Sequence, residues 1–194
     1  MTNIKTNETW VMWPTSICPS FFDNPANGAV SGNKNFSFEL EFKLNSFVGE
    51  RGTILSVNPN HFVLHYYDDY LSAIHMSTDG RKRHNVHEDI YKTIKLGKAH
   101  KLKVENLYSS EFNVYIDDNK VLSTKNFNTT KDPQILFGSE TISNDDLATN
   151  SCDIDLYSFK LYRDEDLISN HDFNKMINNK FVDLTNNCNF IHKL

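Results

Sequence analysis

Residues 36–44 alternate without a break between apolar and polar side chains. In an extended strand successive side chains point to opposite faces, so this run has one apolar face and one polar face. The segment is therefore expected to be a β-strand with one face in a core and the other toward water. The apolar positions are Phe36, Phe38, Leu40, Phe42 and Leu44, and the polar ones are Ser37, Glu39, Glu41 and Lys43.

Further short segments with strand character follow at regular intervals, separated by turn residues such as Asn58-Pro59-Asn60. Many short strands with this punctuation are typical of an antiparallel all-β sandwich with little helix. The segments are 53–57, 61–67, 70–76, 90–95, 100–105, 111–116, 120–123, 134–137 and 152–162. Residues 164–177 allow one or two short helical turns. We expect a single domain over residues 1–194, in which the C-terminal segment 164–194 packs back on the body as an extended tail.

The strand expected at 152–162 changes phase. Cys152, Ile154 and Leu156 share one face, whereas Tyr157, Phe159 and Leu161 fall on the other. Two explanations stay open. Either a β-bulge shifts the register, or the strand is central and buried on both faces.

The composition excludes several classes of protein. With 39% hydrophobic and 12% aromatic residues, the 194-residue chain can bury a core. A net charge of −5 without a basic stripe argues against nucleic-acid binding. No apolar run approaches the roughly 18 residues of a membrane span, and the polar N-terminus predicts no secretion signal. The three cysteines have neither disulfide nor zinc spacing.

Several segments in order carry a family pattern. The Phe-x-Phe-x-Leu-x-Phe run at 36–42 precedes Gly52–Val57, and a hairpin at 61–76 follows. Later come Glu111–Leu122, with its Val-Tyr-Ile-Asp run, and Asp155–Tyr162. Together they resemble the laminin G-like, concanavalin A-like jelly roll. The resemblance covers about residues 30–165 and implies a module that binds glycans or serves adhesion and assembly.

The closing segments are similar to those of laminin G-like modules in phage tail and virion proteins. They are Asp166–Asn170 and Phe181–Asn187. This resemblance implies a virion protein that is made in the host cytoplasm. Its partners would be a glycan or host-surface polysaccharide and other virion proteins.

A cluster of tyrosines and aspartates marks the expected tip of the 61–76 hairpin. Pyranoses are held by aromatic stacking together with carboxylate hydrogen bonds, and this cluster supplies both. Alternation puts Tyr66 and Tyr67 on opposite faces, so only one of the two can stack on a ligand. The predicted ligand-binding residues are Tyr66, Tyr67, Asp68, Asp69 and Tyr70. The alternative is a hairpin whose tyrosines cover the sheet.

Metal binding and catalysis are weaker interpretations. Laminin G-like modules hold calcium through aspartates at the sandwich rim, and the resemblance suggests Asp145 and Asp146 for that role. The pair Asp117-Asp118 is accounted for by a turn. The cluster at His84–Asp89 is expected to be a solvated loop. Glucan hydrolases of this superfamily need two glutamates around an aspartate, and Glu39 and Glu41 lack that aspartate.

We therefore expect a non-catalytic glycan-binding or adhesion module in a phage virion. A purely structural virion subunit without a ligand is the first alternative. A degenerate enzyme with a glycosidase fold is the second.

Overall fold

The computed structural model describes residues 1–4, 9–12, 36–47, 51–58, 62–67, 71–77, 83–86, 94–105, 112–124, 134–138, 152–163, 165–177, 180–183 and 190–193. These residues form antiparallel strands and turns, and none of them is helical. Consequently, no helix in this part of the chain could cross a membrane.

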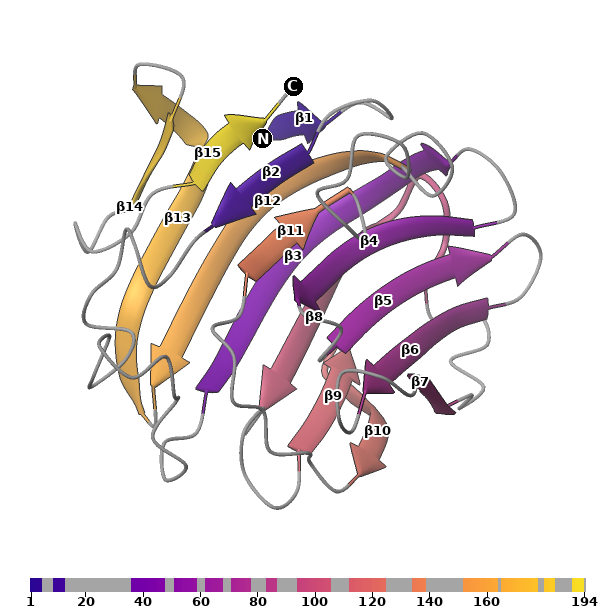
Figure 1. The fold of residues 1–194 in the computed structure, drawn as a ribbon. Coiled ribbons are helices and arrows are strands. Elements are labelled where there is room, and N and C mark those ends of the chain that lie inside the picture. The colour runs from indigo at the N-terminus through magenta and orange to yellow at the C-terminus, as the bar shows by residue number, and fades with distance from the viewer. Residues whose placement is uncertain are drawn as a thin grey trace.

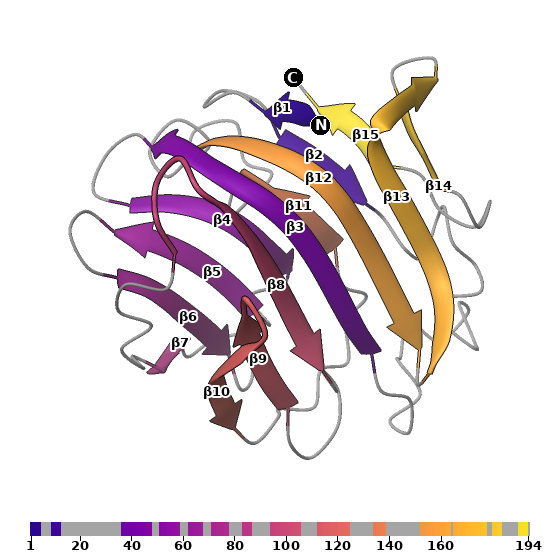
Figure 2. The ribbon, with the colours of Figure 1, turned by 180° about the vertical axis from the view of Figure 1, so that it is seen from behind.

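The strands stack in two layers (Figures 1 and 2). The first layer follows the order β10 (Asn119–Thr124), β9 (Phe112–Ile116), β8 (Ala99–Glu105), β3 (Phe36–Phe47), β12 (Cys152–Arg163) and β13 (Asp166–Ile177). The second layer follows the order β2 (Thr9–Met12), β11 (Gln134–Phe137), β4 (Arg51–Asn58), β5 (Phe62–Tyr67), β6 (Leu71–Ser77) and β7 (Arg83–Val86). The architecture is the antiparallel jelly-roll sandwich that the sequence predicted.

Two further strands complete the hydrogen-bonded path, and a third strand lies off it. β14 (Lys180–Asp183) and β15 (Phe190–Lys193) pair in series between β13 and β2, so they join the two layers at one side. β1 (Thr2–Ile4) pairs with the first half of β12. It occupies the side of β12 along which β13 pairs only from Ser158 onward.

The core lies between the layers, and β3 contributes a continuous row to it. Phe38, Leu40, Phe42 and Leu44 are buried, which confirms the predicted inward face. The second layer contributes Ile54, Leu55, Leu64 and Phe137 to the same core. The rings of Phe38, Phe137 and Phe159 pack in series, with centroids 5.6 and 6.0 Å apart.

The phase change in β12 is a β-bulge, the first of the two explanations left open. Leu156 pairs with Phe42 and Ser158 pairs with Glu41, so Tyr157 is the extra residue between them. Because of this extra residue, both Leu156 and Phe159 face the core.

The prediction of helical turns over 164–177 is wrong, because residues 166–177 form strand β13. Its inward residues are Ser169, His171 and Phe173, which are all buried. Ser169 Oγ lies 2.9 Å from His171 Nε2, so the two polar side chains share a hydrogen bond inside the core. Two of the three inward residues are polar, and the alternation was therefore hidden in the sequence.

Two other local predictions also need correction. Ile94 and Lys95, the last residues of the strand expected at 90–95, are not in a strand. Conversely, His84, expected in a solvated loop, falls in β7, which pairs with β6. No group of three or more metal-ligating side chains occurs among the described residues.

Gly52 marks the closest approach between the layers. A Cβ atom at this position would lie 2.5 Å from Phe47 Cβ and 3.1 Å from Cys152 Cβ. The Cys152 Sγ also lies 3.0 Å from the Thr53 carbonyl oxygen, and burial raises the pKa of its thiol. The start of β4 therefore fits against β3 and β12 only without a side chain at residue 52.

Replacing Gly52 by Ala is expected to lower the free energy of unfolding by about 1–3 kcal/mol, the usual cost of overpacking a close-packed core. Urea denaturation measures the change. Gly97→Asn is the matched control, since Gly97 has a φ of 73° and no atom within 4 Å of an added Cβ. Asn tolerates that backbone conformation, so this variant should stay close to wild type. Equal losses in both variants would contradict the steric explanation.

Candidate functional site

The outward face of the first layer is polar and partly open to solvent. It carries the second row of the alternating β3 pattern, in which Glu41 is exposed and Glu39 and Lys43 are half-buried. By contrast, the outward residues Thr53 and His65 on β4 and β5 of the second layer are fully buried, with Thr53 Oγ1 3.1 Å from His65 Nδ1. The candidate site therefore lies on the first layer.

A polar network draws Lys43 toward β12. Its Nζ lies 2.6 Å from Asp155 Oδ2. Asn3 on β1 donates from Nδ2 to Asp155 Oδ1 and to Asp153 Oδ1, both at 2.7 Å. Burial alone would raise the pKa of Asp155, but the hydrogen bonds from Lys43, Asn3 and Asn45 outweigh it and hold the pKa below its usual range. Asp155 is thus a fixed anion that holds the Lys43 side chain.

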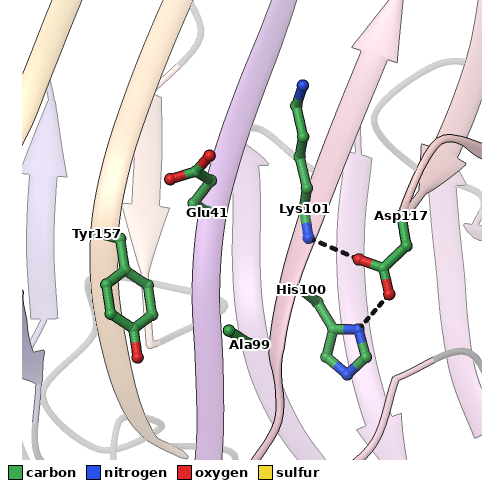
Figure 3. A pocket seen from close by; sticks show the side chains of 6 residues that line it. All are labelled: Glu41, Ala99, His100, Lys101, Asp117 and Tyr157. Atoms are coloured by element: carbon green, nitrogen blue, oxygen red, sulfur yellow. Dashed lines mark hydrogen bonds and ion pairs between the residues drawn. The ribbon is translucent and has the colours of Figure 1, made fainter.

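A hollow of about 380 Å³ opens on this face, between β12 and the β9–β10 turn (Figure 3). Ala99 pairs with Lys43 in the sheet register. Because Ala99 has only a methyl group and Lys43 is held by Asp155, neither side chain fills this part of the surface. The lining residues are Glu41, Ala99, His100, Lys101, Asp117 and Tyr157.

The bulge supplies the aromatic wall of the hollow. Tyr157 is the extra residue of β12, it is half-buried, and its ring lies alongside the space around Ala99 (Figure 3). Bulges of this kind re-aim a side chain relative to the regular alternation of a strand. The ring therefore presents an apolar surface in an otherwise polar face.

Glu41 contributes a carboxylate from the neighbouring strand. Ser158 Oγ donates to Glu41 Oε2 at 3.0 Å, while Oε1 has no partner among the described residues. Lys101, the register partner of Glu41, has its Nζ 3.8 Å from Glu39 Oε2. In Figure 3 the Lys101 side chain extends away from Ala99. The hollow thus has a hydrogen-bond acceptor beside an aromatic ring.

The opposite wall is a His–Asp pair in which the histidine is buried and the aspartate is partly exposed. The backbone N–H of Lys95 donates to His100 Nε2 at 2.9 Å, so Nε2 is an acceptor and the ring proton sits on Nδ1. His100 Nδ1 then donates to Asp117 Oδ2 at 2.8 Å, and the Lys101 N–H donates to Asp117 Oδ1 at 2.9 Å. Both ring nitrogens are used and the ring is fully buried, so His100 positions Asp117.

Asp117 combines this role with the turn that its sequence predicted. Asp117 and Asp118 have φ values of 50° and 63°, as a tight β-hairpin turn requires. Burial would raise the pKa of Asp117, but hydrogen bonds from the Lys101 backbone and from His100 outweigh it and lower the pKa. The turn explanation given for Asp117-Asp118 is therefore incomplete, since the Asp117 carboxylate also locks the turn to β8.

The structure describes two of the five residues predicted to bind a ligand at the β5–β6 hairpin. Tyr66 packs against the core, with its ring centroid 5.5 Å from that of Phe47. Tyr67 is half-buried and stacks edge-on with His65 at 6.1 Å. Asp68, Asp69 and Tyr70 lie outside the described residues. The aspartates predicted for calcium, Asp145 and Asp146, also lie outside them.

Sequence reasoning missed the hollow. Tyr157 belonged to the phase change noticed in 152–162, which was the available signal. Glu41 was considered only as half of a hydrolase pair. Nothing in the sequence indicated that Ala99 and Lys43 would be register partners, since they lie on strands far apart in the chain.

Comparison with known proteins supports the fold. No family model matches the sequence, and no curated protein matches it either. A protein of Bacteroides ovatus ATCC 8483, provisionally assigned as carbohydrate-binding, superposes with a TM-score of 0.57 over 96% of this chain at 9% identity. Two structures of the polysaccharide lyase family 7 alginate lyase A1-II′ give TM-scores of 0.53 and 0.51, over 72% and 67% of the chain, at 14% and 12% identity.

The chain spans less than two thirds of each of these structures, namely 56%, 65% and 62% of their lengths. At such identities the likeness shows the fold alone. That fold is the jelly-roll sandwich of the concanavalin A-like type.

Replacing Asp117 by Asn should lower the free energy of unfolding at neutral pH. The variant should then lose less of this free energy than wild type as the pH falls. A carboxylate with a depressed folded pKa contributes stability above its unfolded pKa, about 3.9, and loses it as the pH falls through the folded value. The difference between wild type and Asp117→Asn should therefore be full above about pH 5 and shrink below about pH 4. Urea denaturation at a series of pH values measures this difference.

Asp118→Asn controls for the turn itself, because Asp118 is the exposed turn neighbour. Its free energy of unfolding at neutral pH should stay within about 0.5 kcal/mol of wild type, because the side chain is exposed. A constant difference between wild type and Asp117→Asn across the whole pH series would contradict the assigned role of the carboxylate.

Proposed function

We propose that the protein is a non-catalytic glycan-binding module that holds a sugar in the hollow beside Tyr157. One observation carries the proposal. An aromatic ring and a carboxylate with an unused oxygen border the same 380 Å³ hollow. Pyranose rings have apolar faces and a polar rim, so they need this combination of stacking and hydrogen bonding.

The neighbours with the same fold give a context for this proposal. One is a provisionally assigned carbohydrate-binding protein, and the other is an alginate lyase in complex with a substrate. The first description supports a binding role for this fold and the second supports a catalytic one. The choice between binding and catalysis for this chain therefore depends on its own residues.

The lining of the hollow argues against a hydrolase that uses a pair of carboxylates. Lyase or hydrolase chemistry requires a general base and a general acid that can reach the reacting bond. Both nitrogens of His100 are engaged, and both oxygens of Asp117 accept hydrogen bonds. Among the lining residues, Glu41, Tyr157 and Lys101 then remain to contact a substrate. Neither Glu39 nor Asp117 completes a carboxylate pair with Glu41, because Glu39 does not line the hollow and Asp117 is committed to the turn.

We also propose that the tip of the β5–β6 hairpin is an additional contact for the glycan. Tyr66 is no longer included among its binding residues. Tyr67 is the tyrosine of the pair that does not pack on Phe47, so it is the one that would stack, together with Asp68, Asp69 and Tyr70. Tyr66 is assigned to core packing.

Calcium binding by Asp145 and Asp146 stays a proposal. Thermal denaturation with and without a chelator tests it.

Replacing Tyr157 by Ala should weaken glycan binding by about 1 kcal/mol, the value of one stacking contact. Screening on a glycan array followed by calorimetry of the best hit measures the effect. Tyr162→Ala is the matched control, since Tyr162 is a half-buried tyrosine on the same strand but does not line the hollow. Equal losses in both variants would place the sugar elsewhere. Release of unsaturated or reducing ends from the bound glycan would show that the protein is an enzyme.

The virion setting is a separate proposal, and it rests on the resemblance of the two closing segments alone. Mass spectrometry of purified phage particles should detect the protein alongside other virion proteins. Incorporation into particles that survives loss of glycan binding would favour the purely structural alternative.

A further inference from the structure

The charge of the hollow limits which sugars can enter it. Its lining carries two carboxylates, Glu41 and Asp117, against one ammonium, Lys101. Asp117 stays ionised at neutral pH because two N–H donors hold its pKa low. His100 adds no charge, since its Nε2 accepts a hydrogen bond from the Lys95 backbone. The lining is therefore net negative.

Three lysines of this face already have carboxylate partners. Lys43 is bound to Asp155 at 2.6 Å, and Lys103 is bound to Glu105 at 2.6 Å. Lys101 is directed toward Glu39, with its Nζ 3.8 Å away. Three ammonium groups on β3 and β8 thus already face a carboxylate, whereas Lys98 acts on Asp117 and lowers its pKa. A sugar carboxylate entering the hollow would meet the carboxylate of Glu41.

The same arrangement suits a hydroxyl group of the sugar. Glu41 Oε1 lacks a partner among the described residues, and a carboxylate accepts strong hydrogen bonds from hydroxyl donors. The fixed position of Glu41, held through Oε2 by Ser158, lets a hydroxyl reach it while the sugar face lies on Tyr157. Ala99 leaves the floor low enough for the ring.

We propose that the hollow selects a neutral pyranose that donates a hydroxyl group to Glu41, and that it rejects uronates. This inference rests on the proposed glycan-binding function and names its ligand class. Glu41 is the specificity-determining residue, Tyr157 the stacking platform and Ala99 the floor. The ligand class thereby differs from alginate, which is a polymer of uronates.

The test compares two sets of hexasaccharides by calorimetry. One set is neutral, built from glucose, mannose or galactose, and the other contains guluronate or mannuronate. Wild type should bind at least one neutral hexasaccharide and bind the uronates at least tenfold more weakly. Glu41→Gln should weaken the neutral ligand about tenfold and narrow the gap to the uronates, because it removes the negative charge but keeps the shape.

Glu105→Gln is the matched control for charge. It makes the same charge change on the same face, but Glu105 does not line the hollow. This variant should leave both affinities within about twofold of wild type. An equal effect of Glu41→Gln and Glu105→Gln would reduce the preference to the general field of the surface and overturn the role of Glu41.

Ala99→Leu separates failure of this inference from failure of the proposed function. Ala99 is exposed, so the larger side chain should fill the hollow without unfolding the protein, which a thermal melt verifies. Uronates that bind tighter than neutral sugars and are lost in Ala99→Leu would overturn the neutral ligand class while the glycan site stands. Binding of either set that is unaffected by Ala99→Leu, or no binding at all, would overturn the site itself.

Discussion

The pairing of β3 with β12 is the constraint on which the rest of the sandwich depends. Both strands have 12 residues, and they remain paired from Phe36 and Arg163 at one end to Phe47 and Cys152 at the other. Their inward rows build the first-layer half of the core, because alternation places apolar side chains on the same face of both strands. β8 and β13 then attach to the outer edges of this pair, and β4 crosses it where Gly52 permits close contact.

The candidate site results from the bulge in the pairing of β3 with β12. One extra residue in β12 keeps Leu156 and Phe159 in the core and leaves Tyr157 on the outer face. Asn3 and Asp155 then fix Lys43 away from Ala99. The site thus needs no specialised loop among the described residues. A register shift, a diverted lysine and a small residue on the next strand are sufficient to make a hollow.

Where a strand has one apolar and one polar face, the sequence predicted it well. The segment around 36–44 was found because its inward row is entirely Phe and Leu. β13 was missed because its inward row contains Ser169 and His171, whose mutual hydrogen bond exists only in the folded state. The candidate hollow depends on the register between strands far apart in the chain, such as Lys43 opposite Ala99. A pattern within one strand carries no information about its register, so composition and periodicity could reveal the bulge but not what it faces.

The sequence separation of these contacts has a consequence for synthesis on the ribosome. Glu41 and Ser158 are 117 residues apart, and Asn3 and Asp153 are 150 residues apart. At roughly 5–20 residues per second, β3 emerges on the order of ten seconds before β12 exists to pair with it. During that interval the nascent chain displays a row of phenylalanines and leucines without its main partner. Such non-local topologies fold slowly, so the apolar row of β3 stays exposed to aggregation until β12 has been synthesised.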